Sequence, residues 1–518
     1  MVSLSIPGEA MLASISSSVL RGVDGVPVTV EVHVAGGLPA FTVVGLPDAA
    51  CREARDRVRA AVLSSGLRWP QQRITVNLAP SGLPKAGSGL DLPMAIGVLV
   101  ASGLLDSQRV ADVAFLGELG LGGAVRPVAG IVPLVEALAE RTVVVAPRCQ
   151  AEASIVGRHC VRAAPTLAGV LAALEGSAPW AVGPSPLDRA DSAAPISSGD
   201  LADVRGQPLA RRAVEVAAAG GHHLFLVGPP GAGKTMLAQR LVGLLPLLEP
   251  SVALETTKIH SAAGERLPIG GLISWAPFRA PHHGASMAAL VGGGSSWLRP
   301  GEISLASGGV LFLDELAEFT PAVLDALRQP LEEGRIRLAR ASGSVSFPAR
   351  FLLVAASNPC PCGNAGTPQP CRCSVAIRRR YRRRLSAPLL DRFDLRLGVQ
   401  RLDPERLTIG GPEESSEVVA ARVAAARELA RHRGVGANRD LAGALLERHA
   451  VLGSSGRALL TDALRQQRLT ARGVDRVRRV ARTLADLAGD AGAELRDEHL
   501  SLAMYLRAEP EALLGVEP

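Results

Sequence analysis

Aromatic residues, cysteines and long apolar runs are all scarce in this chain. Aromatic residues make up 3% of its 518 residues, so alanine, valine and leucine must fill most of its cores. Seven cysteines in a chain of this length argue against a disulfide framework. The longest strongly apolar stretch, Leu92–Leu105, is shorter than the roughly 20 residues that span a bilayer. No signal-peptide pattern opens the sequence. We therefore expect a cytoplasmic protein without a membrane partner.

The charge is mild overall but unevenly distributed. The formal net charge is +7 at pH 7. Residues 334–384 contain eleven arginines and no Asp, Glu or Lys, so the remainder of the chain carries 7 − 11 = −4. A run such as Arg378–Arg384 alone is more often a solvated helix face. The wider cluster is the electrostatic footprint of a nucleic-acid-binding surface, and DNA is the polyanion that we expect as partner.

The patterning divides the chain into four parts. Residues 1–175, which we call the front domain, alternate strand-like and helix-like patterns and predict a separate α+β domain. Residues 176–199 have the Pro- and Ser-containing composition of a linker. Residues 200–398 combine short apolar runs with helical patterns and predict an α/β core with a parallel sheet. Residues 399–518 are strongly helical and predict a small α-helical lid.

A glycine-rich loop at residues 228–235 is the most specific motif. Its sequence, GPPGAGKT, fits the phosphate-binding pattern G-x-x-x-x-G-K-T. The apolar run Leu224–Val227 precedes it and a helical pattern follows, so free backbone N–H groups at a helix N-terminus can bind phosphate. The motif assigns nucleotide binding to Gly228, Pro229, Pro230, Gly231, Ala232, Gly233, Lys234 and Thr235. Lys234 is expected to reach the β and γ phosphates of ATP, and the Thr235 hydroxyl to bind Mg²⁺.

A second apolar run, Val310–Leu313, ends in two carboxylates. Many core strands end in an acidic residue, so the pattern alone is weak. This strand lies about 80 residues after the phosphate loop, which is the place of the Walker B motif in phosphate-loop ATPases. Asp314 is expected to hold Mg²⁺, directly or through water. Glu315 is expected to orient and deprotonate the attacking water, which makes it the predicted catalytic base.

Two close C-x-C pairs lie in a Gly- and Pro-rich insert at residues 360–373. Four thiolates in this arrangement are typical of a structural Zn²⁺ site, because they leave no open position for substrate. Free thiols, a redox-labile pair and an iron–sulfur cluster are the alternatives. The predicted ligands are Cys360, Cys362, Cys371 and Cys373. The adjacent His282 and His283 also invite a metal assignment, but no third ligand has suitable spacing.

Several longer segments resemble the YifB/ComM family of magnesium-chelatase-like AAA+ ATPases. The resemblance covers essentially the whole chain and implies a hexameric ring motor that needs ATP and Mg²⁺. In ComM-type members the implied activity is ATP-driven DNA helicase and branch migration during homologous recombination of incoming DNA. The segments that carry the resemblance are Gly45–Asp48, Asn77–Pro80, Pro84–Pro93, Pro277–His283 and Pro300–Ser304.

The resemblance also assigns roles to single residues. Asn358, at the end of an apolar strand, fits the sensor that touches the γ-phosphate or the attacking water. Arg392 fits an arginine finger that reaches the nucleotide of a neighbouring subunit, with a salt bridge to a flanking aspartate as the alternative. Arg472 fits the second sensor, with Arg476 as the next choice. Residues 334–350 fit a hairpin that points into the ring's channel, with a solvated basic edge as the alternative.

The front domain is similar to the proteolytic domain of Lon but lacks its catalytic pair. Gly89 stands where Lon has its nucleophilic serine, although Ser88 is adjacent, and Leu134 stands where Lon has its lysine base. Leucine cannot act as a base. We therefore expect a scaffold for assembly or for nucleic-acid contact rather than a protease.

Two other functions fit the same core motifs. A chelatase-type subunit would use ATP hydrolysis to drive metal insertion by partner proteins, but such subunits generally begin directly with the ATPase core. A protein-remodelling ATPase without DNA is the second. Salt-sensitive DNA binding would separate both from a DNA motor, because neutralised phosphates release counterions.

Overall fold

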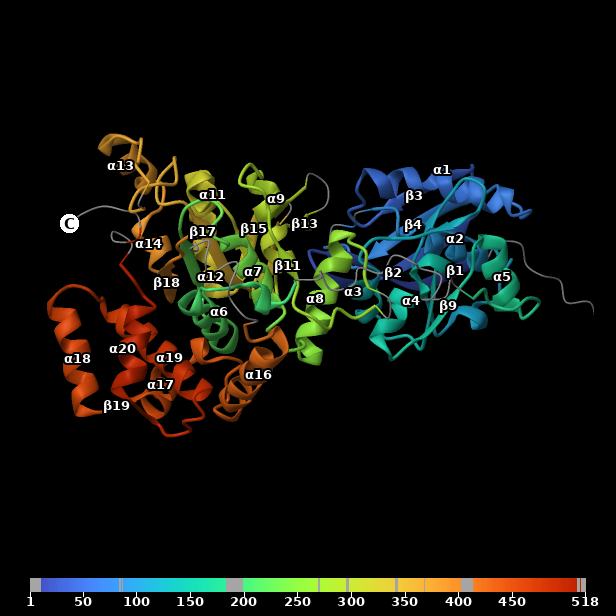
Figure 1. The fold of residues 1–518 in the computed structure, drawn as a ribbon. Helices are drawn as coiled ribbons and strands as arrows, with labels where there is room; N and C mark the ends of the chain where they lie inside the picture. The colour runs from blue at the N-terminus through green and yellow to red at the C-terminus, as the bar shows by residue number, and fades with distance from the viewer. Residues whose placement is uncertain are drawn as a thin grey trace, which may run out of the picture.

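The computed structural model describes residues 11–82, 85, 87–182, 199–268, 271–294, 298–340, 343–367, 369–401, 413–509 and 513. Figure 1 shows the chain running from the front domain (blue) through a central domain (green to orange) to a group of C-terminal helices (red). Most of the predicted linker lies outside the described residues, as do Pro84 and Ala86 of the front-domain motif and Ser342. In the described part, no helix combines the length and the apolar character that a membrane span requires.

The front domain is built on a seven-stranded mixed sheet with the order β3-β4-β2-β1-β5-β8-β9. β2 runs antiparallel to β1 and β4, and the remaining neighbours are parallel. Helix α2 (Asp91–Ala101) is buried along its whole length, as its unbroken apolar sequence requires. The sheet strands are β1 (Met11–Arg21), β2 (Asp24–Ala35), β3 (Ala40–Val44), β4 (Arg73–Ala79), β5 (Val113–Phe115), β8 (Thr142–Val145) and β9 (Cys160–Ala163).

Shorter elements complete the front domain. The Asp48 carboxylate accepts a hydrogen bond from the backbone N–H of Cys51 (2.8 Å) and caps α1, whose sequence pattern predicts this helix. The other elements are α1 (Ala49–Ser64), β6 (Glu118–Leu119), β7 (Val125–Arg126), α3 (Ile131–Glu136), α4 (Gln150–Ala153) and α5 (Leu167–Glu175).

The central domain contains a five-stranded parallel sheet with the order β11-β14-β17-β10-β18. Successive side chains of β10 enter two different cores: Leu224 and Leu226 pack on one face, Phe225 and Val227 on the other. A strand buried on both faces reads as a continuous apolar run, which is why these strands are visible in the sequence. They are β11 (Phe278–Arg279), β14 (Val310–Leu313), β17 (Leu352–Ser357), β10 (Leu224–Val227) and β18 (Leu395–Gly398).

Helices and two small hairpins surround this sheet. α6 (Pro208–Gly220) and α7 (Lys234–Val242) share one core with the C-terminal helices, while α8 (Pro250–Ala263) lies toward the front domain. The other elements are α9 (Met287–Val291), β12 (Gly292–Gly293), β13 (Arg299–Pro300), α10 (Glu302–Leu305), α11 (Pro321–Ala326), α12 (Arg328–Glu333), β15 (Arg335–Arg340), β16 (Gly343–Pro348), α13 (Val375–Arg383) and α14 (Ala387–Leu390).

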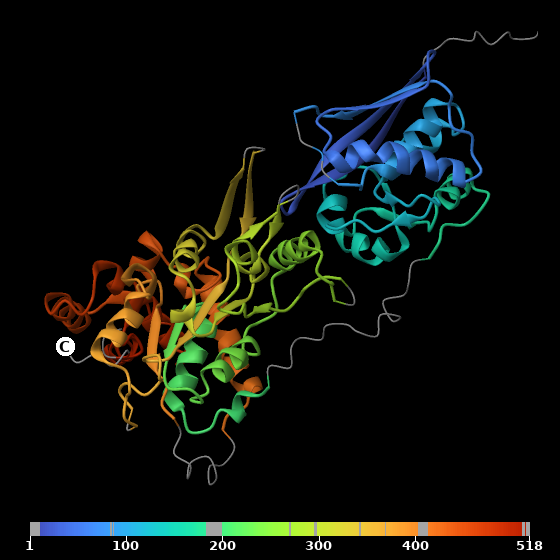
Figure 2. The same ribbon diagram turned by 90° about the horizontal axis from the view of Figure 1, so that it is seen from above.

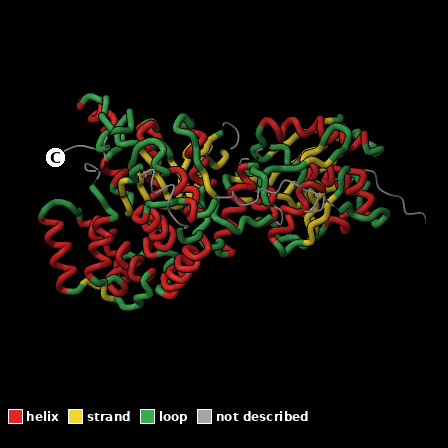
Figure 3. Tube along the Cα trace, in the orientation of Figure 1, coloured by secondary structure: helices red, strands yellow, loops and turns green. Residues whose placement is uncertain are grey.

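The C-terminal region is mainly helical, as Figure 3 shows. α16 and α19 pack against α6, and an ion pair of 2.5 Å between Arg476 and the buried Asp394 ties α19 to the central domain. The elements are α16 (Ser416–His432), α17 (Gly443–His449), β19 (Val451–Leu452), α18 (Ser454–Arg465), α19 (Ala471–Leu487), β20 (Glu494–Leu495) and α20 (Asp497–Tyr505).

The front domain docks directly on the central domain, and the two are seen side by side in Figure 2. Lys258 on α8 pairs with Glu136 (2.6 Å) and Asp24 (3.3 Å) of the front domain. Leu267 and Ile273 of the central domain belong to the front domain's hydrophobic core. The two parts that the sequence predicts as separate therefore share buried surface.

Candidate nucleotide site

The phosphate loop lies between β10 and α7, as the motif predicts. A side chain at Gly228 would place its Cβ 2.1 Å from the Val399 carbonyl oxygen, so only glycine fits there. Gly233 caps α7 with a φ of +85°, a left-handed conformation that favours glycine. Pro230, Gly231 and Thr235 are exposed at the rim, so the loop is open to a ligand from solvent.

Lys234 and Asn358 meet in the floor of this site. β17 pairs with β10, so their carboxyl ends lie at one edge of the sheet, where parallel α/β folds bind ligands. The buried Lys234 ammonium donates to the Gly228 carbonyl (2.7 Å), to the Pro229 carbonyl (3.0 Å) and to Asn358 Oδ1 (3.1 Å). Burial lowers the pKa of Lys234, while the charges of Asp314 and Glu315 oppose that shift. The phosphate-binding lysine and the predicted sensor are therefore within one hydrogen bond of each other.

Thr235 and Asp314 form the second contact at this edge. The Thr235 hydroxyl donates to Asp314 Oδ2 (2.7 Å), because β14 ends beside β17 and brings its carboxylate opposite the start of α7. Hydroxyl and carboxylate oxygens are the hard ligands that Mg²⁺ prefers. The oxygen pair predicted to hold Mg²⁺ is thus brought together in the structure.

Glu315 lies next to these oxygens in a strained backbone conformation. Its φ is +52°, which is uncommon for a residue other than glycine and is found most often at functional sites. Its carboxylate lies 3.2 Å from Nδ1 of His283. His283 reaches this point because β11 runs parallel to β14 and the loop after β11 leaves the sheet at the same edge. Sequence reasoning considered the His282–His283 pair only as a metal site and missed this contact.

Arg392 and Arg472 lie together, away from the phosphate loop. Both line a cavity of about 680 Å³, and none of its described lining residues comes from the phosphate loop or from β14. Burial lowers the pKa of Arg392, and the nearby charges of Arg476, Arg472 and Arg328 add to that shift. Arg476 is engaged by Asp394, which leaves Arg472 as the sensor candidate that faces the cavity.

The predicted alternative for Arg392 is not what the structure shows. Arg392 pairs with Glu332, Asp391 pairs with Arg507 (3.1 Å), and Asp394 is taken by Arg476. Among the described residues, Arg392 therefore makes no ion pair with a flanking aspartate. Its partner Glu332 is more than half exposed, so that pair lies at the surface.

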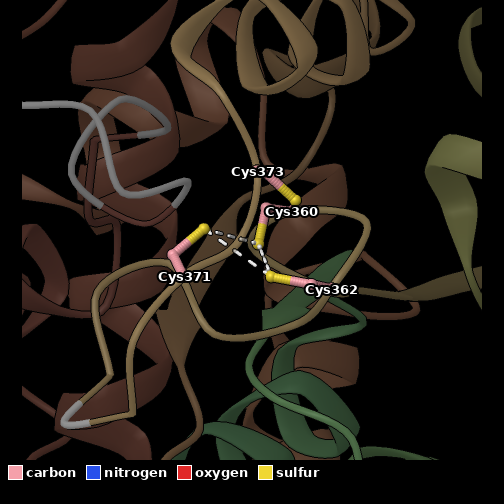
Figure 4. Close-up of side chains that lie close together, drawn as sticks. All are labelled: Cys360, Cys362, Cys371 and Cys373. Carbon is pink, nitrogen blue, oxygen red and sulfur yellow. Dashed lines mark hydrogen bonds between the residues drawn. The ribbon is translucent and has the colours of Figure 1, made fainter.

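The four cysteines of the insert converge on one point, as Figure 4 shows. The sulfur–sulfur distance is 3.4 Å between Cys360 and Cys362, 3.6 Å between Cys362 and Cys371, and 3.7 Å between Cys360 and Cys371. The sulfurs of all four cysteines lie within 4.8 Å of one another. A tetrahedral Zn²⁺ with bonds of about 2.3 Å spaces its sulfurs about 3.8 Å apart, whereas a disulfide requires about 2.05 Å. The geometry fits a metal better than a disulfide. The residues are Cys360, Cys362, Cys371 and Cys373.

The two cysteines of the first pair differ in acidity. Burial raises the pKa of Cys360 to about 12. Hydrogen bonds from the backbone N–H groups of Asn364 and Arg372 lower the pKa of Cys362 to about 6. The lowered pKa of Cys362 favours its thiolate, the form in which a cysteine binds a metal. The insert also contacts the nucleotide site, since a Cβ at Gly363 would lie 2.4 Å from Pro230.

The arginine cluster is continuous in sequence but divided in space. Arg335 and Arg337 lie on the exposed face of the β15–β16 hairpin. Arg382 and Arg383 of α13 line the same cavity as Arg392. Figures 1 and 2 both show α13 and the hairpin at separate places on the central domain. The arginine cluster that is continuous in the sequence is therefore divided between two basic surfaces of one chain.

The front domain contains no serine–lysine pair at the positions that match Lon. Leu134 is buried in the core. The Ser88 hydroxyl contacts the Glu118 carboxylate, and the buried Lys85 donates to the Pro80 carbonyl. Ser88 therefore lies beside an acid rather than a lysine base.

The sheet and its edge define the class of protein, a magnesium-chelatase-like AAA+ ATPase. Three family models match: "Magnesium chelatase, subunit ChlI" over residues 200–407, "Subunit ChlI of Mg-chelatase" over 30–148, and "Magnesium chelatase, subunit ChlI C-terminal" over 413–507. The chain is 50% identical to an uncharacterized protein of Mycobacterium tuberculosis, covering 91% of this chain and 94% of that one. It is 44% identical to the competence protein ComM of Haemophilus influenzae (96% and 97%) and 42% to the protein YifB of Escherichia coli (98% and 99%). The chain belongs to the YifB/ComM family, and the resemblance predicted from its motifs is confirmed.

Proposed function

We propose that this protein is a DNA motor that works as a hexameric ring and hydrolyses ATP between neighbouring subunits. The observation that carries the proposal is the separation of its catalytic groups within one chain. Lys234, Asn358, Thr235 and Asp314 meet at the phosphate loop, whereas Arg392 and Arg472 share a distant cavity. In a head-to-tail ring, each interface joins two different surfaces of neighbouring copies. The arginine surface of one copy then faces the phosphate loop of the next.

Each group at this edge has a role in phosphoryl transfer. Lys234 and the backbone N–H groups of the loop bind the β and γ phosphates, and Asn358 fixes the γ-phosphate or the attacking water. Glu315 accepts the proton of that water. Thr235 and Asp314 would hold Mg²⁺, which would supply positive charge that offsets the charge on the phosphate oxygens. Arg392 of the next subunit stabilises the charge of the transition state.

DNA is the proposed cargo, and helicase and branch migration are the proposed activities. The exposed arginines of the β15–β16 hairpin support DNA contact, and a relative over nearly the whole chain is named for competence. Homologous recombination or DNA uptake is the corresponding pathway. A structural Zn²⁺ in the four-cysteine insert completes the proposed set of cofactors.

ATPase measurements with different DNAs test this proposal. Activity is measured without DNA and with single-stranded, duplex and branched DNA at two salt concentrations. We expect stimulation that weakens as salt rises. The double variant Arg335→Ala/Arg337→Ala should lose the stimulation, while Arg55→Ala/Arg59→Ala, a matched pair on the front-domain helix α1, should keep it. An ATPase that ignores every DNA would favour a chelatase-type or protein-remodelling function instead.

A further inference from the structure

In the part of the chain that the structure describes, the β15–β16 hairpin pairs with no further strand. It forms a two-stranded sheet, and such a hairpin is marginally stable in water unless one face is packed. Its pairing places Ile336 opposite Phe347 and Leu338 opposite Val345. This apolar face is turned inward, and the arginines lie on the other face. The position of the basic face therefore depends on what covers the apolar one.

Part of that cover comes from the front domain. The tip of the β1–β2 hairpin, residues 20–24, reaches the central domain at β16. Val23 is only 3% exposed and belongs to the hydrophobic cluster that contains Phe347, while Leu20 packs against that cluster. Among the described residues of that buried cluster, Val23 is the one that the front domain supplies.

The fit at the tip is close. Gly22 has a φ of +69°, and a Cβ there would lie 2.4 Å from Cγ1 of Val345. The Arg21 guanidinium donates to the Ser344 carbonyl (3.3 Å). On the side facing α8, Asp24 pairs with Lys258 (3.3 Å). Apolar, polar and charged contacts thus fix one short turn against two elements of the central domain.

The hairpin in turn leads directly into the nucleotide site. β16 ends at Pro348, and β17 begins at Leu352 and ends next to Asn358. The Arg350 backbone is held on both sides, donating to Ser307 Oγ (3.2 Å) and accepting from Gly308 (2.8 Å). Only residues 349–351 therefore separate the hairpin from the strand that ends next to Asn358.

We propose that the β1–β2 tip of the front domain is a positioning element for the DNA-contacting hairpin. The front domain, which has no catalytic pair of its own, holds the basic face of β15–β16 at a set place and couples it to Asn358. The DNA part of this inference rests on the proposed function, whereas the positioning of the hairpin does not.

Two glycines in the front domain provide a matched test. Gly22→Ala introduces a side chain at a positive φ and pushes it against Val345. Gly66→Ala introduces the same strain at a φ of +78° but meets nothing within 4 Å. Amide hydrogen exchange of residues 335–348 is measured in the full-length protein. We expect exchange about tenfold faster in Gly22→Ala, or about 1.4 kcal/mol of lost protection. Gly66→Ala should match the unmodified chain.

Second-site changes make the test specific. Val345→Ala added to Gly22→Ala should restore much of the protection, because it removes the atom that the new Cβ meets. If Gly22→Ala does not fold, Val23→Ser probes the same contact, with Val182→Ser, 94% exposed, as its control. Unchanged hairpin exchange in both Gly22→Ala and Val23→Ser would overturn the inference.

The functional readout separates this inference from the proposed function. With the hairpin displaced, the basal ATPase should persist and its DNA stimulation should fall at least about fivefold in Gly22→Ala relative to Gly66→Ala. If DNA does not stimulate the unmodified protein, the proposed cargo is wrong, and hydrogen exchange still decides the positioning role. Full DNA stimulation in Gly22→Ala with a destabilised hairpin would refute the coupling.

Discussion

Activation between subunits predicts that two inactive variants become active when they are mixed. Arg392→Ala keeps the phosphate loop but removes the finger, and loss of such an arginine typically costs roughly 10³-fold or more in kcat. Lys234→Ala keeps the finger but loses the lysine that binds the phosphates. Because no described residue of the phosphate loop lines the cavity of Arg392, the proposed ring would complete each active site with one group from each of two copies.

The size of the recovery follows from random assembly. A site works when its phosphate loop comes from an Arg392→Ala chain and its finger from a Lys234→Ala chain. At equal mixing, about one half times one half of the interfaces, or about one quarter, meet this condition. ATPase activity should therefore rise from near zero in either parent to about a quarter of the unmodified level. The recovery should follow the product of the two fractions across the mixing series.

The assay requires subunit exchange and a partner that assembles. The variants are denatured together and refolded, or co-expressed, and ATP turnover is measured at each ratio. In a parallel series, Glu315→Gln replaces Lys234→Ala. Because Glu315→Gln is expected to bind ATP, a missing recovery in that series could not be explained by subunits that fail to assemble for lack of nucleotide. No recovery at any ratio in either series would refute action in trans, as would an Arg392→Ala parent with full activity.

Four further predictions concern the central domain. Glu315→Gln should still bind ATP, while its kcat for ATP hydrolysis should fall by roughly 10²–10⁴-fold. His283→Ala should lower kcat by about tenfold without changing the KM for ATP. His282→Ala is the control, and a normal kcat in His283→Ala would show that the contact between His283 and Glu315 is not used. The purified protein should carry about one Zn²⁺ per chain. The Cys360→Ser variant should lose this Zn²⁺ and melt at a lower temperature than the unmodified chain. Metal analysis that finds no Zn²⁺ in the unmodified chain would contradict the assignment. Asp394→Asn should lower the free energy of unfolding by about 3–5 kcal/mol, because it leaves buried cations without their partner; chemical denaturation measures this loss, and an unchanged midpoint would refute it.

The buried Asp394 also predicts how stability depends on pH. Burial raises the pKa of this carboxyl group, but the nearby His222 imidazole and the charge of Arg476 outweigh that effect and hold the pKa well below 3.8. An unfolded aspartate titrates near about 3.9. The stabilisation is therefore complete above that value and is lost as the pH falls toward the folded pKa. The melting temperature of the unmodified chain should drop in this acidic range, and the drop should be smaller in Asp394→Asn.

The parts of the fold that were readable from sequence are those that local patterns determine. The phosphate loop, the apolar strands β10, β14 and β17, and the cap of α1 by Asp48 follow from short-range rules of burial and capping. Asn358 meets Lys234 because two of those strands, β10 and β17, are neighbours in the sheet, and the sequence pattern alone does not give that order. The four cysteines could be grouped by spacing alone.

What escaped the sequence depends on contacts between distant segments. The approach of His283 to Glu315 requires β11 to lie beside β14, and a two-residue strand gives little pattern from which to predict it. The docking of Gly22 on Val345 joins residues more than 300 positions apart, and no periodicity encodes such a pair. The two basic surfaces looked like one because charge counting ignores which element carries each arginine.

The division of the arginines changes what the charge means. Arginines on α13 that line the cavity of Arg392 face the place where a neighbour's triphosphate is expected, and a triphosphate is a polyanion as DNA is. The exposed hairpin arginines Arg335 and Arg337 are then the better DNA-facing candidates, and they lie on an element that the front domain contacts. Neutralising Arg382 and Arg383 should therefore weaken ATP turnover with or without DNA, whereas neutralising Arg335 and Arg337 should remove only the DNA response. If neutralising either arginine pair lowered only the DNA stimulation of the ATPase, and by the same factor, both pairs would belong to one DNA-binding surface.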